Sequence, residues 1–269
     1  MIKMVATDID GTILGYDFVF RPAVKRCIKE LTDQGIKVVL VTGRMHSAAE
    51  KIAQKLDITT PIISYQGGMI KEQGEGGQIL YEKTLSPNRA KEIIQWAKAN
   101  NIHTNLYMDD VLYVEHDNIA IKRYTGERFI PYQVCNFDDL EIKNVNKILC
   151  IDFDDAERVT GWVEFLREKM PELYIVKSTP YFCEITNNEA KKSCAVEFLR
   201  QKWGLQKEEI LAIGDQNNDI ELLKAGGIGV AMGNGTPELK ACADYITDTI
   251  ENDGFVKAVE KFCKIKVKE

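Results

Sequence analysis

The segment IKVVLVT at positions 36–42 constrains the fold more than any other part of the sequence. Its residues are apolar at nearly consecutive positions and mostly β-branched, which is typical of a strand buried on both faces in a parallel sheet. Apolar runs also occur at 2–7 and 61–65, and helical patterns at 21–35 and 47–56 separate the three runs. This alternation predicts an α/β fold in which helices cover both faces of a parallel sheet.

The last third of the chain repeats the same alternation. Apolar runs typical of buried strands are separated by amphipathic helical patterns, and glycines end several of them. The segments concerned are helical at 195–204, 218–227 and 254–263, and strand-like at 209–215 and 228–232. These elements therefore extend the predicted parallel sheet.

The middle of the chain has a different pattern, with a helix followed by hairpin-like strands around Asp109 and Asp110. We interpret residues 85–183 as a smaller α+β cap domain that is inserted into the α/β core. The predicted core then consists of a first part at 1–84 and a second part at 184–269.

The composition excludes several classes of function. The 269 residues carry a formal net charge of −6 and a pI near 5.4, whereas a nucleic-acid partner requires a basic surface. No apolar run reaches the ~18 residues of a membrane span. The seven cysteines form an odd set without a C-x-x-C pair, which indicates reduced thiols. We therefore expect a cytoplasmic protein that binds neither nucleic acid nor a membrane.

The segment DIDGT near the N-terminus places Asp8 and Asp10 at the end of the first apolar run. Residues two apart on a strand share a face, and open α/β sheets bind ligands at the carboxyl ends of their strands. Two close carboxylates need a positive group, and Mg²⁺ combines one or two carboxylates with water and phosphate oxygens. Gly11 permits a tight turn, and Thr12 can support the loop by a hydrogen bond. A calcium loop is not expected, because its twelfth position would hold Asp17 instead of Glu.

Other polar groups follow the remaining predicted strands. Thr42 and Gly43 follow the run VVLV and offer a hydroxyl and a free backbone N–H to phosphate oxygens. Asp215, Asn218 and Asp219 follow the run ILAIG in the last third of the chain. The carboxyl ends of parallel strands meet at one edge of a sheet, so these groups are predicted to share a site with the DIDGT segment.

A phosphate site also needs a cation, and two adjacent lysines precede the helical pattern at 195–204. They are Lys191 and Lys192 in the segment EAKKSCA. The residue types alone leave both lysines open as the functional one.

Together these motifs resemble those of the haloacid dehalogenase (HAD) superfamily phosphatases, in the Cof-type branch with a large α/β cap domain. The resemblance covers nearly the whole chain and rests on DIDGT, VTGR, the lysine of EAKKSCA, GDQNNDIELL and the trailing GVAMGNGTPELKACADYIT and NDGF. It implies a Rossmann-like parallel-sheet core with an inserted α+β cap, and Mg²⁺ as the cofactor.

The resemblance also implies the roles of single residues. Asp8 is expected to be the nucleophile that becomes an aspartyl phosphate. Asp10 is expected to protonate the leaving oxygen and then to activate water. Thr42 and Lys192 are expected to hold the phosphoryl group. The implied metal ligands are Asp8, the backbone carbonyl of Asp10, and Asp215.

Further positions either support this pattern or depart from it. Asn218 and Asp219 are expected to support the metal-binding loop and the phosphate. Lys192 is preferred to the lysine before it, because it falls where the family pattern has its lysine. Gln66 stands where the family usually has Asn, and Ser193 stands where it usually has Gly. Neither departure removes a chemical group that the reaction requires.

The sequence thus predicts a Mg²⁺-dependent phosphatase that hydrolyses small phosphomonoesters, with sugar phosphates as the expected class. Its partner would be a small phosphorylated metabolite, and the chain would be a monomer or a weak homodimer. Two alternatives remain open. One is a phosphosugar mutase of the phosphomannomutase type, and the other is a non-catalytic sensor of phosphorylated metabolites.

Overall fold

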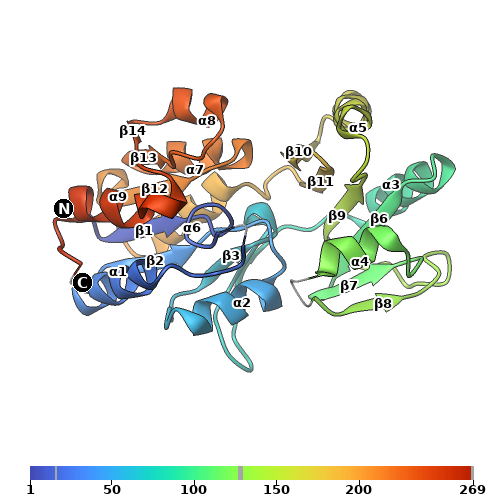
Figure 1. Cartoon of the computed structure of the whole chain (residues 1–269). Helices are drawn as coiled ribbons and strands as arrows, with labels where there is room; N and C mark the ends of the chain where they lie inside the picture. The colour runs from blue at the N-terminus through green and yellow to red at the C-terminus, as the bar shows by residue number, and fades with distance from the viewer. Residues whose placement is uncertain (16, 127–129, 268–269) are drawn as a thin grey trace. The chain divides into compact units, whose positions relative to one another are not determined.

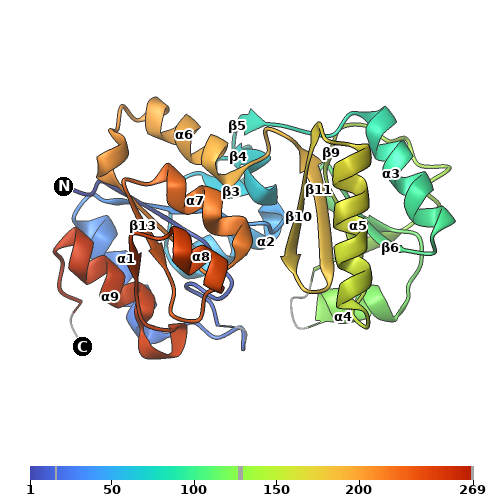
Figure 2. The same cartoon turned by 90° about the horizontal axis from the view of Figure 1, so that it is seen from above.

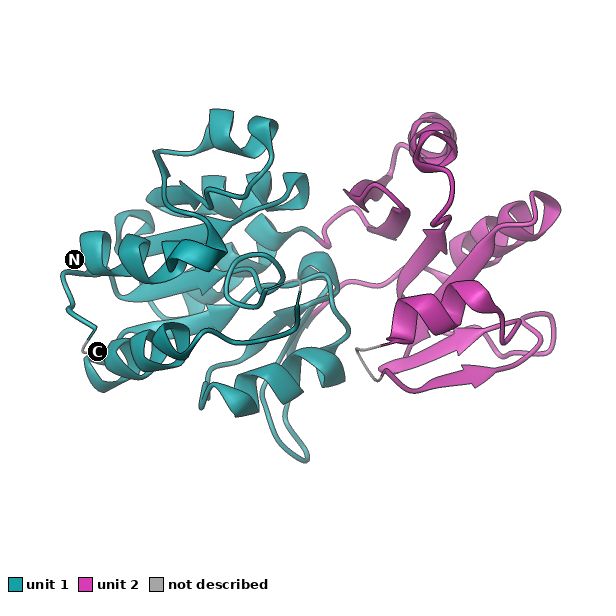
Figure 3. Ribbon diagram, viewed as in Figure 1, with its two compact units in different colours: residues 1–81, 191–269 teal, residues 82–190 magenta. Residues whose placement is uncertain are grey.

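The computed structural model describes residues 1–15, 17–126 and 130–267. The described chain divides into two compact units, which Figure 3 shows in different colours. Unit 1 consists of Met1–Tyr81 and Lys191–Glu269, and unit 2 consists of Glu82–Ala190, so the second unit is inserted into the first.

Unit 1 is built on a five-stranded sheet in which the paired strands all run parallel (Figure 1). The strand order is β14-β13-β12-β1-β2, with β1 at Met4–Thr7, β2 at Lys37–Leu40, β12 at Ile210–Gly214, β13 at Ile228–Ala231 and β14 at Tyr245–Ile246. Within it, Ala6 of β1 lies opposite Val39 of β2 and Ala212 of β12. The predicted parallel sheet is thereby confirmed.

Helices cover both faces of this sheet (Figure 2). Val38 and Leu40 pack on one face in a core with α1 and α9, whereas Val39 packs on the other face with α6 and α7. The period of two explains why the four consecutive residues 38–41 are all apolar, since their side chains alternate between the two helix layers. The helices of unit 1 are α1 Pro22–Asp33, α2 His46–Lys55, α6 Lys192–Lys202, α7 Ile220–Ala225, α8 Pro237–Cys242 and α9 Gly254–Cys263.

The run at 61–65 forms β3 (Ile62–Ser64), but it joins the parallel sheet through an isolated bridge between Val41 and Ile63. Its ladder is antiparallel to β4 (Met69–Lys71), in a small sheet that also contains β5 (Ile79–Glu82). A short 3₁₀ turn, η1 at Tyr65–Gly67, causes this difference from the prediction, because it reverses the chain directly after β3.

Unit 2 contains a six-stranded sheet and its own apolar core. The strand order is β10-β11-β9-β6-β7-β8, with β6 at His103–Met108, β7 at Val111–Val114, β8 at Tyr132–Val134, β9 at Val145–Ile151, β10 at Leu173–Thr179 and β11 at Phe182–Asn187. α3 (Pro87–Ala99) and α5 (Ala156–Lys169) pack their buried faces into this core, and α4 spans Ile119–Thr125. Asp109 and Asp110 both have positive φ angles in the turn of the β6–β7 hairpin, as a type I′ hairpin turn requires.

The boundaries predicted for the cap, 85 and 183, both lie inside unit 2. β11 begins at Phe182 and pairs with both β9 and β10, so its hydrogen bonds place the whole strand in unit 2. The predicted boundary at 183 therefore falls inside a strand of this sheet. In the part of the chain that the structure describes, no helix is long and apolar enough to cross a membrane. All seven cysteines are free thiols.

Candidate active site

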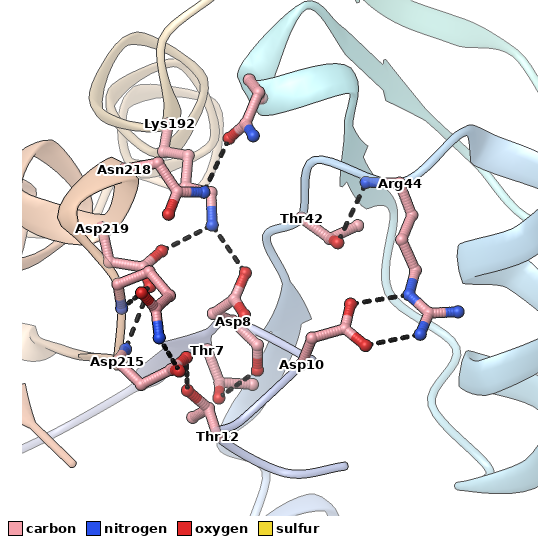
Figure 4. A network of polar contacts seen from close by, with 12 residues as sticks. Thr7, Asp8, Asp10, Thr12, Thr42, Arg44, Lys192, Asp215, Asn218 and Asp219 are labelled. Carbon is pink, nitrogen blue, oxygen red and sulfur yellow. Dashed lines mark hydrogen bonds and ion pairs between the residues drawn. The ribbon is translucent and has the colours of Figure 1, made fainter. Parts of the chain in front are cut away.

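The candidate site lies at the carboxyl ends of β1 and β12. Asp8 directly follows β1 and Asp215 directly follows β12. The two strands pair in parallel, with Thr7 opposite Ile213, so both aspartates leave the sheet at the same edge. The parallel pairing of β1 and β12 thereby brings together two carboxylates that are far apart in the sequence (Figure 4).

Lys192 links Asp8 to a third carboxylate. Its ammonium Nζ donates hydrogen bonds to Asp8 Oδ1 at 2.6 Å and to Asp219 Oδ1 at 2.5 Å, as Figure 4 shows. The lysine is the first residue of α6 and is only 1% exposed, and Asp8 is 7% exposed. Lys191 is the N-cap residue before it. Of the two lysines left open by the sequence, Lys192 is therefore the one that contacts Asp8.

The charges around Lys192 are unbalanced. Three buried carboxylates, of Asp8, Asp215 and Asp219, have oxygens within 4.8 Å of one another. Burial raises the pKa of Asp8 well above its usual value, and Asp219, Asp215 and Asp10 raise it further against the opposing effect of Lys192. Burial lowers the pKa of Lys192, but Asp219 and Asp8 outweigh it and hold this pKa above its usual value. The site thus carries excess negative charge and favours a further cation.

Asp215 and Asp219 are fixed by hydrogen bonds from their own loop and from the DIDGT segment. Asp219 Oδ2 accepts from the backbone N–H of Asp215 at 3.0 Å and of Gln216 at 3.1 Å. Asp215 accepts from the hydroxyl of Thr12 at 3.0 Å and from the side-chain amide of Gln216 at 3.0 Å. Both oxygens of Asp219 accept from N–H donors of Lys192 and of its own loop, and both oxygens of Asp215 accept from side chains. These hydrogen bonds hold the two carboxylates in place beside Asp8.

Asp10 directs its carboxylate away from Lys192 and toward Arg44 (Figure 4). The guanidinium donates from Nε to Asp10 Oδ2 at 2.7 Å and from Nη2 to Oδ1 at 2.5 Å, which is a bidentate ion pair. The backbone N–H of Arg44 also donates to the Thr42 hydroxyl at 3.1 Å. Arg44 ends the VTGR motif two residues after Thr42, but the motif alone predicted no role for it.

The remaining predicted residues lie in two further loops. Thr42 is buried, and its N–H donates to the carbonyl of Ile63. Asn218 donates from its side-chain amide to Gln66 Oε1 at 3.1 Å. Gly43 lies against the Gln66 amide, where a Cβ on Gly43 would come within 2.9 Å of Gln66 Cδ. The departure noted at Gln66 therefore lies within the site.

The predicted site residues lie in three groups, two of which also contain Arg44 or Gln66. In the first group Lys192 contacts Asp8 and Asp219, and Thr12 contacts Asp215. In the second, hydrogen bonds join Arg44 to Asp10 and to Thr42. In the third, Gln66 contacts Gly43 and Asn218.

Comparison with known proteins shows the family of the chain. The family model of the haloacid dehalogenase-like hydrolases matches residues 5–259. The chain belongs to this family. Among curated HAD relatives, the 5-amino-6-(5-phospho-D-ribitylamino)uracil phosphatase YcsE of Bacillus subtilis is 30% identical, over 96% of this chain and 94% of its own length.

Solved structures match nearly the whole length of the chain. A haloacid dehalogenase-like hydrolase from Bacteroides thetaiotaomicron has a TM-score of 0.86 and 26% identity, covering 97% of this chain and 99% of its own. A protein of Thermotoga maritima has a TM-score of 0.83 and 30% identity, covering 100% of this chain and 99% of its own. The predictions of an HAD-superfamily phosphatase and of its fold class are confirmed.

Proposed function

We propose that this HAD phosphatase is Mg²⁺-dependent and hydrolyses phosphomonoesters of sugars and related polyols through an aspartyl phosphate on Asp8. One observation carries the proposal, namely the contact of the buried Lys192 with Asp8 and Asp219 beside Asp215. A carboxylate that attacks phosphorus must approach a dianion, and a buried cation next to it lowers the repulsion.

The residues fit a divalent cation. Three buried carboxylates lie around the Lys192 ammonium, and burial together with the neighbouring carboxylates raises the pKa of Asp8. Mg²⁺ prefers oxygen ligands, and Asp8, Asp215 and the backbone carbonyl of Asp10 would hold it. Bound there, the ion would offset the charge of the carboxylates and of the phosphoryl group.

The chain's own residues then account for the first step. Asp8 attacks phosphorus with a carboxylate oxygen, the bond to the leaving oxygen breaks, and an aspartyl phosphate forms. Lys192, the Thr42 hydroxyl and the backbone N–H of Gly43 stabilise the phosphoryl oxygens. The ion pair between Asp219 and Lys192 keeps the lysine in place, and Asn218 supports the phosphate.

Asp10 supplies the proton transfers in this proposal. It donates a proton to the leaving oxygen and then accepts one from the water that attacks the aspartyl phosphate. In the structure both of its carboxylate oxygens contact Arg44. Proton transfer therefore requires one oxygen to exchange its guanidinium partner for the leaving group or for water, while the other keeps the carboxylate oriented.

The substrate class is supported by the relative from B. subtilis. Its name specifies a phosphate on a ribitylamino chain, which is an acyclic polyol. Sugar phosphates and polyol phosphates share a phosphate ester of an aliphatic alcohol with neighbouring hydroxyl groups. We infer that this chain acts on esters of the same kind.

Phosphate release from a panel of sugar and polyol phosphates, with Mg²⁺ and then with excess EDTA, tests the proposal. We expect hydrolysis of several members with Mg²⁺ and a loss of at least about 100-fold with EDTA, because the carboxylates would be left uncompensated. Undiminished activity in EDTA would contradict the metal requirement. Binding without hydrolysis would indicate a sensor, and isomerisation stimulated by a sugar bisphosphate would indicate a mutase.

The proton-transfer role of Asp10 predicts a result that depends on the leaving group. In Asp10→Asn, phosphorylation of Asp8 should stay fast with p-nitrophenyl phosphate, because the phenolate leaves without a proton, and become slow with a sugar phosphate. Hydrolysis of the aspartyl phosphate should be slow with both, so the aryl ester should give a burst of roughly one phenolate per enzyme. Rapid-quench kinetics measure both steps.

Asp33→Asn is the matched control for this experiment, because Asp33 is an exposed aspartate that pairs with Lys29 on α1. It should show wild-type kinetics with both esters. If Asp10→Asn slows phosphorylation equally for the two esters and gives no burst, Asp10 is not the proton donor.

A further inference from the structure

The turn η1 at Tyr65–Gly67 contacts the loop that carries Thr42. The backbone N–H of Gln66 donates to the Thr42 carbonyl at 3.0 Å, and the N–H of Tyr65 donates to the Arg44 carbonyl at 2.9 Å. These two hydrogen bonds fix the turn to both ends of the Thr42–Gly43–Arg44 segment. A displacement of the turn would therefore displace the predicted phosphate donors.

The backbone of this turn is strained. Tyr65 and Gln66 have φ angles of 52° and 61°, a left-handed conformation that side chains other than glycine rarely adopt. Both residues are almost completely buried, at 0% and 1% exposure. Strained residues of this kind persist where their surroundings hold them, and they concentrate at functional sites.

The side chain of Gln66 connects two further parts of the site. Its Oε1 accepts from the side-chain amide of Asn218 at 3.1 Å. Its amide group also fills the space beside Gly43 in which any side chain would lie. Gln66 thus touches the loop after β2 directly and the loop after β12 through Asn218.

The third residue of the turn approaches the lysine. A Cβ on Gly67 would come within 2.7 Å of the backbone nitrogen of Lys192, at the start of α6. The turn therefore packs against the backbone of Lys192, as well as against Gly43 and Asn218. One three-residue segment contacts all three loops that supply the proposed phosphate-binding groups.

We infer that Gln66 is a positioning residue for phosphate binding: its carboxamide orients Asn218 and packs on Gly43, so that both present their donors to one phosphoryl group. The inference rests on the proposed function for the identity of the ligand. A residue that orients donors for the bound phosphoryl group affects the ground state and the transition state alike. Its loss should therefore raise KM and weaken inhibition by inorganic phosphate more than it lowers kcat.

Gln66→Asn separates the backbone from the side chain. Asn tolerates positive φ angles better than Gln does, so the melting temperature should be kept or raised. The side chain is shorter by one methylene and cannot keep both the contact to Asn218 and the packing on Gly43. With Mg²⁺ present, we expect phosphate affinity to fall by about tenfold, the size of one lost hydrogen bond to an oriented donor, and kcat to change by less than about threefold.

Gln66→Glu tests the same contact at constant side-chain length. One carboxylate oxygen can still accept from Asn218, but the other places a negative charge beside Gly43. Because this charge would repel a phosphoryl group, phosphate affinity should fall further than in Gln66→Asn. Gln73→Asn is the matched control, since Gln73 lies in the same unit and holds the backbone carbonyls of Ile58 and Thr60.

Titration calorimetry with inorganic phosphate, together with KM, kcat and melting temperature, decides between the outcomes. The inference is overturned if both Gln66 variants keep phosphate affinity within about twofold of Gln73→Asn, or if affinity falls only where the melting temperature falls. If wild type binds phosphate and the variants weaken this binding, but no ester is hydrolysed, the inference holds and the proposed function fails. If wild type does not bind phosphate, the inference is wrong, and hydrolysis of the ester panel still decides the proposed function.

Discussion

Asp8→Asn is expected to abolish phosphate release, with kcat falling by about four orders of magnitude or more, the cost of removing a nucleophile from its catalytic unit. The amide keeps the volume of the carboxylate and can still accept a hydrogen bond from Lys192, but it cannot attack phosphorus. Steady-state phosphate release with a sugar phosphate and with an aryl phosphate measures the effect.

The matched control for this variant is Asp57→Asn. Asp57 is an exposed aspartate of unit 1 that pairs with Lys25, and its positive φ angle suits Asn. The control should keep wild-type activity. If Asp8→Asn retains activity within about tenfold of wild type, far less than the loss expected for a nucleophile, Asp8 is not the nucleophile.

Asp8→Asn should also be more stable than wild type when Mg²⁺ is removed. The folded-state pKa of Asp8 is raised, so ionisation of this group at neutral pH opposes folding, and stability increases as the pH falls toward the unfolded pKa. Asn removes the charge and keeps the shape. Melting temperatures at neutral pH in EDTA should therefore be higher for the variant, and a lower value would contradict the account of excess negative charge.

Lys192→Met should have the second large effect, on both activity and stability. The substitution keeps side-chain length but removes the ammonium that contacts Asp8 and Asp219, leaving buried carboxylates without their partner. Breaking a buried pair in this way costs about 3 kcal/mol or more, and activity should fall by at least about 1,000-fold because the charge near the phosphoryl group is lost. Phosphate release and thermal unfolding measure the two effects.

Lys191→Met is the control on the neighbouring residue. Lys191 is the N-cap of α6 and is less buried than Lys192, so we expect activity within about threefold of wild type and a small change in melting temperature. If Lys191→Met lost activity and Lys192→Met kept it, the functional ammonium would be that of Lys191.

Much of the fold could be predicted because its determinants are local. The run at 36–42 is apolar at both alternating sets of positions, and this feature indicates a strand between two helix layers. The helical pattern at 21–35 predicted α1, and the structure buries the apolar face of this helix. β3 and its parallel bridge to Val41 agree with the prediction for 61–65, whereas its antiparallel ladder with β4 was not predicted, because this ladder depends on the strained turn after Ser64.

The site could be predicted to the same extent and for the same reason. Asp8 and Asp215 follow strand ends, and parallel strands bring such ends to one edge. The contacts of Arg44 with Asp10 and of Gln66 with Asn218 could not be predicted, because they join residues 34 and 152 positions apart through side chains. Local spacing does not encode how far a side chain reaches or in which direction it points.

The central claim is that the phosphoryl group passes through the carboxylate of Asp8. Acid quenching of the enzyme during turnover of a phosphate ester, followed by peptide mapping with mass spectrometry, tests it directly. We expect a phosphoryl group on the peptide that contains Asp8, removable by hydroxylamine, present in wild type, accumulating in Asp10→Asn and absent in Asp8→Asn. Turnover by Asp10→Asn without a phosphorylated Asp8 peptide would contradict the account. A phosphoryl group on another residue would also contradict it.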